Sequence, residues 1–444
     1  MATKEKRIPN AVRIPTAIDD IEDFPPSEIL AIRSSLLRWY DKNSRDLPWR
    51  TPPAAFRPPL LDVEYEQRAY AVWVSEVMLQ QTRVPTVIGY FNRWMEKWPT
   101  IHDLSSASLE EVNEMWAGLG YYRRARFLLE GAKSIVNQRN FPRTASALRD
   151  VRGIGNYTAG AIASIAFNEI VPVVDGNVVR VITRLKAISA NPKEARTVKL
   201  IWKLAGQLID PSRPGDFNQS VMELGATLCS SAKPSCSNCP VSLQCLAFSL
   251  SKKSETSKVT DYPTKAVKTK QRRDFAAVSV VEISEELDEQ ILNDNCRENV
   301  FLLVKRADSG LLAGLWEFPS VLLDEEKMNQ EMRRGEMNEY LKRFLNLDVE
   351  ENCKVVLRQD VGEHIHVFSH IRLHMHVELL ILTLKDGFTR LNNDEDRDKV
   401  IWKWVDESSI SKMGLTSGVR KVYRMAQDFK QTKQPLRLPK KRAK

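Results

Sequence analysis

The chain has 444 residues, 43% of them hydrophobic and 28% charged, a balance that is ordinary for two or three globular domains. It contains no run of eighteen apolar residues, and its first residues, "MATKEKRIPN", include no apolar core. We therefore expect neither a transmembrane helix nor a secretory signal peptide. The net charge of +9 favours a polyanionic partner, while a solvated basic surface would account for it equally well.

The first half of the chain has the periodicity of helices. Residues 1–25 are polar and predict a tail, and apolar residues then recur at helical spacing over 26–250, as in "SEILAIRSSLLRWYDK". This region predicts an all-α domain, interrupted by a proline-rich loop over 51–67. The polar, lysine-rich stretch 251–273 predicts a linker.

The second half reads as an α+β domain over 274–430, followed by a basic tail at 431–444. Strand patterns such as "FAAVSVVEI" and "ELLILTL" alternate with helical patterns near 324–345 and 416–430. Five of the six histidines lie at even numbers between 364 and 376. On one unbroken strand they would share a face, and we favour a solvated strand face over a metal site.

Four cysteines form a compact loop with the spacing C-x6-C-x2-C-x5-C: Cys229, Cys236, Cys239 and Cys245. Zinc sites usually contain two CxxC-type pairs, whereas this loop has one, so the spacing favours a four-thiolate iron–sulfur cluster. Zinc and buried free thiols remain open on these residues alone. Cys296 and Cys353 are interpreted as structural.

A tight turn occurs at "RGIG", residues 152–155. Gly153 and Gly155 separate a helical pattern at 146–151 from a second one that begins at Asn156. Glycines at such a turn let backbone N–H groups point outward at a helix N-terminus, where they bind phosphate, and Arg152 adds a positive charge. An ordinary helix–helix turn with a glycine cap remains open.

Two carboxylates lie in contrasting surroundings. Glu76 is the only charged residue between Ala69 and Gln81, and an apolar neighbourhood is expected to raise its pKa. Asp175 follows the apolar run "IVPVV" and precedes Gly176. A solvated edge position for Glu76 and a helix cap or turn for Asp175 remain open.

Read together, these features resemble the MutY family of helix-hairpin-helix DNA glycosylases, relatives of endonuclease III. The motifs that carry the resemblance follow in order: "LPWR" (47–50), "SEVMLQQT" (75–82), "GLGYYRRAR" (118–126), the hairpin within 146–167, "VDGNVVRV" (174–181), "FNQSVMELG" (217–225) and the cysteine loop (229–245). "GLLAGLWEFPSV" (310–321) resembles the start of a MutT-like (Nudix) fold, without the carboxylate order of a working Nudix box.

The resemblance implies an enzyme that hydrolyses the N-glycosidic bond of adenine mispaired with 8-oxoguanine, or with guanine, and so begins base excision repair. It implies that Glu76 protonates adenine, that Asp175 stabilises the sugar cation, and that Tyr157 and Asn177 position them. The lysine of the strand-cleaving relatives is replaced by Tyr157, which implies a monofunctional glycosylase. It also implies a [4Fe–4S] cluster on the four cysteines.

The same resemblance implies contacts to duplex DNA. The expected backbone and wedge contacts are Gln81, Tyr121, Arg152, Gly153 and Gly155, and the residues expected near the adenine are Arg50 and Gln219. "HVFSH" (366–370) resembles the loop with which MutY proteins contact 8-oxoguanine, which assigns that contact to Phe368, Ser369 and His370.

Three other functions remain as alternatives: an endonuclease III-like lyase acting on oxidised pyrimidines, a nucleotide hydrolase that uses the Nudix domain, and a DNA-binding protein with a purely structural cluster. We expect a monomer in the nucleus, and in mitochondria as a second location, because "LPKKRAK" (438–444) reads as a nuclear signal. Partner repair or replication proteins cannot be identified from the sequence, and we expect no membrane partner.

Overall fold

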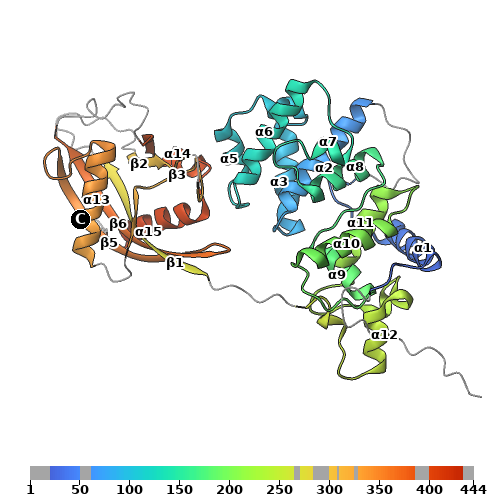
Figure 1. Ribbon diagram of the computed structural model, residues 1–444. Helices are drawn as coiled ribbons and strands as arrows, with labels where there is room; N and C mark the ends of the chain where they lie inside the picture. The colour runs from blue at the N-terminus through green and yellow to red at the C-terminus, as the bar shows by residue number, and fades with distance from the viewer. Residues whose placement is uncertain are drawn as a thin grey trace, which may run out of the picture. The chain divides into compact units, whose positions relative to one another are not determined.

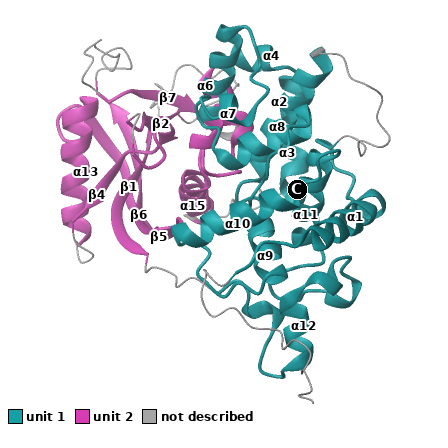
Figure 2. Cartoon of the chain, turned by 45° about the vertical axis from the view of Figure 1, so that its right-hand side comes forward, with its two compact units in different colours: residues 1–107, 127–268 teal, residues 108–126, 269–444 magenta. Residues whose placement is uncertain are grey.

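The computed structural model describes residues 21–50, 62–264, 271–283, 300–307, 310–324, 329–385 and 400–433 (Figure 1). The chain forms two compact units (Figure 2). The first comprises residues 1–107 and 127–268, and the second comprises residues 108–126 and 269–444. Within these described ranges no helix is long and apolar enough to cross a bilayer.

The first unit is helical, as the periodicity predicts. Ile32 and Leu36 of the first helix pack with Val181, Leu204 and Leu224 in one buried core. The described helices of this unit are α1 (Pro26–Asn43), α2 (Asp62–Leu79), α3 (Val84–Lys97), α4 (Ile101–Ser105), α7 (Ala145–Leu148), α8 (Asn156–Phe167), α9 (Gly176–Leu185), α10 (Ala195–Leu208), α11 (Pro214–Ala226) and α12 (Leu246–Lys253). α6 (Arg123–Gln138) begins in the second unit and continues in the first.

Two sequence-based boundaries differ from the structure. α2 begins at Asp62, so the expected loop over 51–67 is wrong for its last six residues. These residues, "DVEYEQ", contain neither proline nor glycine and extend the apolar pattern that follows, while residues 51–61 lie outside the described part. The first part of the expected linker is also folded, because Val259 and Tyr262 are buried against Ala247 and Leu250.

The second unit contains a mixed sheet. In its described residues the sheet has seven strands, with the order β3-β2-β1-β6-β5, and with β4 paired to β1 and β7 paired to β2. The strands are β1 (Arg272–Ile283), β2 (Val300–Lys305), β3 (Trp316–Glu317), β4 (Ser320–Leu323), β5 (Cys353–Val367), β6 (Ile371–Leu384) and β7 (Trp402–Asp406), and the helices are α5 (Leu109–Trp116), α13 (Gln330–Leu345), α14 (Glu407–Lys412) and α15 (Ser417–Lys433).

The two faces of this sheet have separate cores. α13 covers one face, where Met337 and Leu341 pack on Leu380 and Val281. α15 covers the other face, where Val422 and Ala426 pack with side chains of β1 and β6 that point away from α13, such as Val278 and Val377. Cys353 is buried on the α13 face, as expected of a structural cysteine, and Cys296 lies outside the described residues.

The histidines do not lie on one unbroken strand, so the condition for a shared face is not met. The chain turns back at residues 368–370, so the histidines lie on two antiparallel strands, β5 and β6. His366 is in register with Leu373, and Ile365 is in register with His374. Residues in register share a face, so His364 and His366 point to one face of the sheet and His374 points to the other. The turn at residues 368–370 could not be predicted from the even spacing of the histidines, because that spacing continues through the turn.

Candidate active site

One cavity of about 450 Å³ in the helical unit gathers most of the residues that the sequence singled out. It lies between α2, the first turn of α8, the start of α9, and α11. Seven predicted site residues line it: Arg50, Glu76, Gln81, Tyr157, Asp175, Asn177 and Gln219. These residues are up to 169 positions apart in the sequence, from Arg50 to Gln219, and the helical fold brings them to one place.

Glu76 occupies the buried wall of this cavity. Its side chain lies on α2 among Val72 and Trp73, and the residue is 6% exposed. The Tyr157 hydroxyl donates a hydrogen bond to its Oε2. Burial raises the pKa of Glu76 to about 7, with the nearby Asp175 adding to the rise and the Tyr157 hydrogen bond opposing it. A substantial fraction of Glu76 is therefore protonated at neutral pH and able to donate a proton.

Asp175 is both a helix cap and a cavity residue. It is the N-cap of α9, where its Oδ1 accepts a hydrogen bond from the Val178 N–H at 2.7 Å and its Oδ2 accepts one from Asn177 Nδ2 at 2.7 Å. Burial raises its pKa, while these hydrogen bonds and Arg180 act in the opposite direction. Asp175 is therefore a helix cap, one of the interpretations that the sequence left open, and it also lines the cavity.

Asn177 connects Asp175 to the cysteine loop. Its Oδ1 accepts a hydrogen bond from Arg180 Nη2 at 2.7 Å, and Arg180 Nε donates to the backbone oxygen of Cys229 at 2.8 Å. A Cβ on Gly225 would lie 2.6 Å from the Asn177 Cβ, so glycine is required for α11 to approach this closely. A continuous chain of hydrogen bonds therefore runs from the cavity carboxylate to the first cysteine.

Two charged residues of the cavity, Glu223 and Arg45, were not predicted from the sequence. Glu223, which is fully buried, receives hydrogen bonds from Arg45 Nη2 at 2.8 Å and from Arg50 Nη2 at 2.7 Å. Burial alone raises the pKa of Glu223, but the Arg45 hydrogen bonds and the charge of Arg50 outweigh it and hold the pKa below its usual value. The available signal was that Glu223 is the only charged residue in the motif "FNQSVMELG" (217–225).

The glycine turn has the geometry of a helix hairpin. α7 ends before it and α8 begins at Asn156, as predicted. Gly153 has φ +87°, and a Cβ there would lie 2.6 Å from the Phe127 Cβ. Gly155 is the N-cap of α8, whose first N–H groups have no partner within the helix. Arg152 is exposed beside the turn and pairs with Glu130 at 2.9 Å.

The remaining predicted contacts of the helical unit lie at the cavity. Gln81 is exposed at the end of α2 with a left-handed φ of 58°, which places it in the turn that lines the cavity. Gln219 is buried, and its Nε2 donates to the Gly215 oxygen at 3.3 Å. Tyr121 belongs to the second unit, where it is 49% exposed and also has a positive φ, of 49°.

Phe368, Ser369 and His370 form the tip of the β5–β6 hairpin in the second unit. Ser369 and His370 are exposed, and the Ser369 Oγ lies 3.1 Å from the His370 Nδ1. The tip is tied to the start of β1, because Gln271 Nε2 donates to the Phe368 oxygen at 2.8 Å and the Arg272 N–H donates to the His370 oxygen at 3.0 Å. The tip therefore presents polar side chains on a fixed backbone.

The four loop cysteines are half-buried and none is in a disulfide. Arg184 lies among them, since its Nη1 donates to the Cys229 Sγ at 3.2 Å and its backbone oxygen accepts from the Cys245 Sγ at 3.4 Å. Burial raises the pKa of the Cys239 thiol to about 11 and that of Cys245 to about 12.

Four free cysteines in one loop are a donor set that an iron–sulfur cluster can use. Within the described residues, no group of three or more His, Cys, Asp or Glu side chains is arranged to hold one metal ion. A cubane cluster needs only one thiolate at each iron, and Arg184 would place a positive charge beside the anionic cluster.

The helical hairpin, the carboxylate pair in the cavity and the mixed sheet of the second unit define a class of protein: a base excision DNA repair glycosylase with a Nudix-fold domain. Two family models match in agreement with this. Residues 74–207 match the HhH-GPD superfamily of base excision DNA repair proteins, and residues 293–425 match the NUDIX domain.

Named relatives make the assignment specific. The chain is 56% identical to the adenine DNA glycosylase of Arabidopsis thaliana over 91% of its length, spanning 65% of that relative, and 40% identical to the adenine DNA glycosylase of Mus musculus, spanning 79% of it. A solved thermostable thymine-DNA glycosylase is 26% identical over 50% of this chain and 98% of its own, with a TM-score of 0.43. The chain belongs to the adenine DNA glycosylase family.

Proposed function

We propose that this protein excises adenine paired with 8-oxoguanine, or with guanine, from duplex DNA and leaves the sugar–phosphate strand intact. The observation that carries the proposal is the convergence of Glu76, Tyr157 and Asp175 on one cavity of the hairpin-bearing unit. A cavity of about 450 Å³ has room for a purine base and part of its sugar once the nucleotide is flipped out of the duplex.

Glu76 is the general acid in this proposal. Its protonated carboxyl donates to N7 of adenine, the bond between C1′ and N9 breaks, and its electron pair leaves with the base. Asp175, as a carboxylate, stabilises the positive charge that develops on the sugar. A water molecule then adds to C1′ and loses a proton, which leaves an abasic site and free adenine.

We assign base selection to Glu223 and Arg50, which also line the cavity. The Glu223 carboxylate accepts hydrogen bonds only, so it suits the exocyclic amine of adenine, and Arg50 supplies donors for ring nitrogens. Glu223 is already held by Arg45 and Arg50, which fixes its orientation before the base arrives. Gln219, which the sequence placed near the adenine, lines the same cavity.

Strand cleavage is excluded from the proposal because it requires an amine nucleophile. Among the described residues that line the cavity there is no lysine, and Tyr157 is half-buried with its hydroxyl hydrogen-bonded to Glu76. A phenol cannot form a Schiff base with the opened sugar. This feature also argues against an endonuclease III-like lyase.

Cys229, Cys236, Cys239 and Cys245 hold a [4Fe–4S] cluster in this proposal. When bound, the cluster supplies a rigid cross-link between the ends of the loop. The chain's own residues Arg180 and Arg184 tie that loop to α9, through the oxygen of Cys229 in both cases.

The reading of 8-oxoguanine is assigned to the hairpin tip of the second unit. 8-Oxoguanine differs from guanine in carrying a proton on N7 and a carbonyl at C8. The Ser369 hydroxyl can accept from that N–H, and His370 can donate to the carbonyl.

The protein would act as a monomer in the nucleus, with mitochondria as a second location. The basic tail behind this assignment lies outside the described residues.

The experiment is a base-release assay with the purified chain. Duplexes carrying adenine opposite 8-oxoguanine should release free adenine, and duplexes carrying an oxidised pyrimidine should release no base. Borohydride added during turnover should trap no efficient covalent adduct. Release of the oxidised pyrimidine together with efficient trapping would instead support the lyase alternative.

A further inference from the structure

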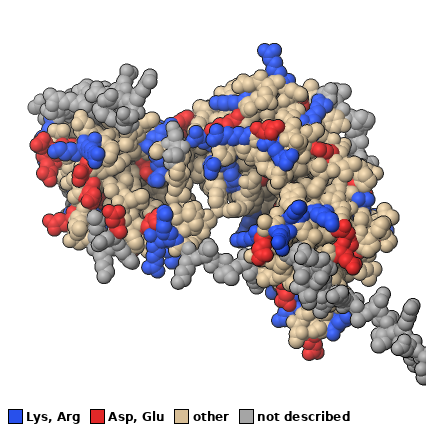
Figure 3. Space-filling model, in the orientation of Figure 1, with Lys and Arg blue, Asp and Glu red and all other residues tan. Residues whose placement is uncertain are grey.

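Two arginines lie side by side at the base of the hairpin tip. β1 and β6 run parallel, and Arg273 of β1 is in register with Arg372 of β6. Both are exposed. Basic and acidic side chains are intermixed on the face of the molecule that Figure 3 shows, so net charge alone locates no anion site. An adjacent pair of like charges on neighbouring strands is a more specific signal.

The sheet register places both side chains on one face. Residues alternate between faces along a strand, so Arg273 shares a face with Phe275, and Arg372 shares it with His374. Phe275 packs against the α13 core, and its ring lies 5.0 Å from that of His374. The two arginines therefore lie on the α13 face.

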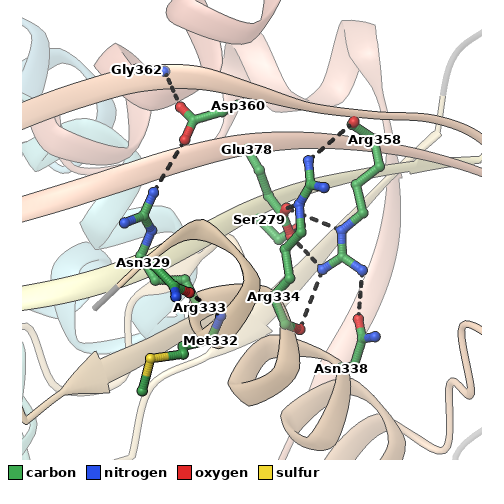
Figure 4. Close-up of polar contacts among 10 residues, drawn as sticks. All are labelled: Ser279, Asn329, Met332, Arg333, Arg334, Asn338, Arg358, Asp360, Gly362 and Glu378. Carbon is green, nitrogen blue, oxygen red and sulfur yellow. Dashed lines mark hydrogen bonds and ion pairs between the residues drawn. The ribbon is translucent and has the colours of Figure 1, made fainter. Parts of the chain in front are cut away.

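Three other arginines of this face, two on α13 and one on β5, have acidic partners. Figure 4 shows Arg358 in two hydrogen bonds with the Glu378 carboxylate, at 2.9 and 3.1 Å, and Arg333 bonded to Asp360 at 3.2 Å. Arg334 also lies 3.4 Å from Glu378. These guanidinium groups are part of the folded structure and are not available to a ligand.

Arg273 and Arg372 differ from that group. Among the residues that the structure describes, neither guanidinium has a hydrogen-bond or ion-pair partner. Glu363, a carboxylate on the same face, is held by His374 at 2.5 Å. Like charges on directly neighbouring strands disfavour the folded sheet, so the pair contributes nothing to stability that would explain it. An anionic ligand would remove the repulsion.

The pair is close to the tip that is proposed to read 8-oxoguanine. Arg372 follows His370 by two residues, which is about 7 Å along an extended chain. We propose that Arg273 and Arg372 together bind a backbone phosphate of the DNA strand that carries the base read by residues 368–370. This inference rests on the proposed function. The contact would fix the register of the tip on the strand and would not itself distinguish bases.

The test compares full-length R273Q/R372Q with R272Q. Arg272 is the matched control, because it lies on the opposite face and its Nε and Nη2 each donate a hydrogen bond to Asp274 at 2.7 Å. DNA binding is measured over a salt series on duplexes with adenine opposite 8-oxoguanine and opposite guanine. For the double variant we expect about tenfold weaker binding to both duplexes at low salt and a salt slope lower by about 1, the value for one phosphate contact, with R272Q unchanged.

Thermal unfolding of the same proteins tests for a folding defect. The double variant should unfold at the same temperature as the wild type or at a higher one. Wild-type affinity and slope in the double variant would overturn the inference and would point to a non-DNA anion, such as an acidic protein segment. An equal loss in R272Q would also overturn it. A wild-type protein that binds both duplexes equally would count against the reading of 8-oxoguanine alone.

Discussion

The Tyr157 hydroxyl donates its hydrogen bond to the same Glu76 carboxyl group whose pKa burial raises to about 7. Tyr157 lies in the first turn of α8, the second helix of the hairpin. The hairpin is expected to bind the DNA backbone, and through Tyr157 it also hydrogen-bonds Glu76, the expected general acid. Because the hydrogen bond stabilises the ionised form, it keeps the pKa of Glu76 from rising further.

This relationship predicts a shift in the pH profile of Tyr157→Phe. Glu76 must be protonated to donate, so the single-turnover rate of adenine release should fall as pH rises through about 7. Loss of the phenol raises the pKa of Glu76, and the alkaline limb should move to higher pH by about one unit or less, since one such hydrogen bond contributes on the order of 1 kcal/mol.

Tyr70→Phe is the control for that measurement. Tyr70 is buried on the same helix as Glu76, but its hydroxyl donates to the Trp98 oxygen at 3.0 Å, outside the residues that line the cavity. Its alkaline limb should coincide with that of the wild type. If the limb of Tyr157→Phe stays in place as well, Glu76 is not the group that titrates.

The effect of the two carboxylates on adenine release should be separable from their effect on DNA binding. Glu76→Gln removes the donated proton and Asp175→Asn removes the negative charge, so each should lower adenine release by about a hundredfold or more. Binding to the mispaired duplex, measured by fluorescence anisotropy, should be retained. Glu194→Gln changes an exposed carboxylate away from the cavity and serves as the control. Excision near the wild-type rate in either cavity variant would remove that residue from the chemistry.

The hairpin glycines predict unequal effects of alanine. Gly153→Ala forces a left-handed φ on a residue with a Cβ and drives that Cβ into Phe127, so it should destabilise the fold by about 1 kcal/mol or more and weaken DNA binding. At Gly155 an added Cβ meets no described atom within 4 Å, and φ is −90°. Thermal denaturation should therefore show a larger loss for Gly153→Ala, and equal losses would contradict this account of the turn.

The hairpin tip predicts a loss of selectivity without a loss of folding. Ser369→Ala with His370→Ala should remove about 1–3 kcal/mol of preference for adenine opposite 8-oxoguanine over adenine opposite guanine, the usual worth of a good base contact. Excision rates on the two duplexes give the ratio, and circular dichroism reports the fold. An unchanged ratio would assign the selectivity to the helical unit.

Glu76 and Asp175 could be named from the sequence because they stand in short local motifs that resemble those of the MutY family, but their convergence on one cavity could not be predicted. Glu76 was identified as a lone charge in an apolar helix, and Asp175 as the residue before a turn. Glu223 carries the same signal but was missed. Its hydrogen-bond partners Arg45 and Arg50 lie 178 and 173 residues away. Pairings across such separations are set by helix packing, which a one-dimensional pattern does not contain.

The histidine run shows the opposite limitation. An alternation of polar residues is compatible with one strand or with two strands joined by a tight turn, and only the pairing of β5 with β6 decides between them. The tip residues 368–370 contain neither glycine nor proline, so the turn had no strong local signal. The arginine pair at β1 and β6 was hidden for the same reason, because parallel register is a tertiary property.

The most direct test of the whole account is the single-turnover rate of adenine release, measured on otherwise identical duplexes with adenine opposite 8-oxoguanine and opposite thymine. The account predicts rapid release of free adenine from the first duplex, none from the second, and an intact strand until alkali or heat is applied. Equal release from the two duplexes, or cleaved strand without free adenine, would contradict it.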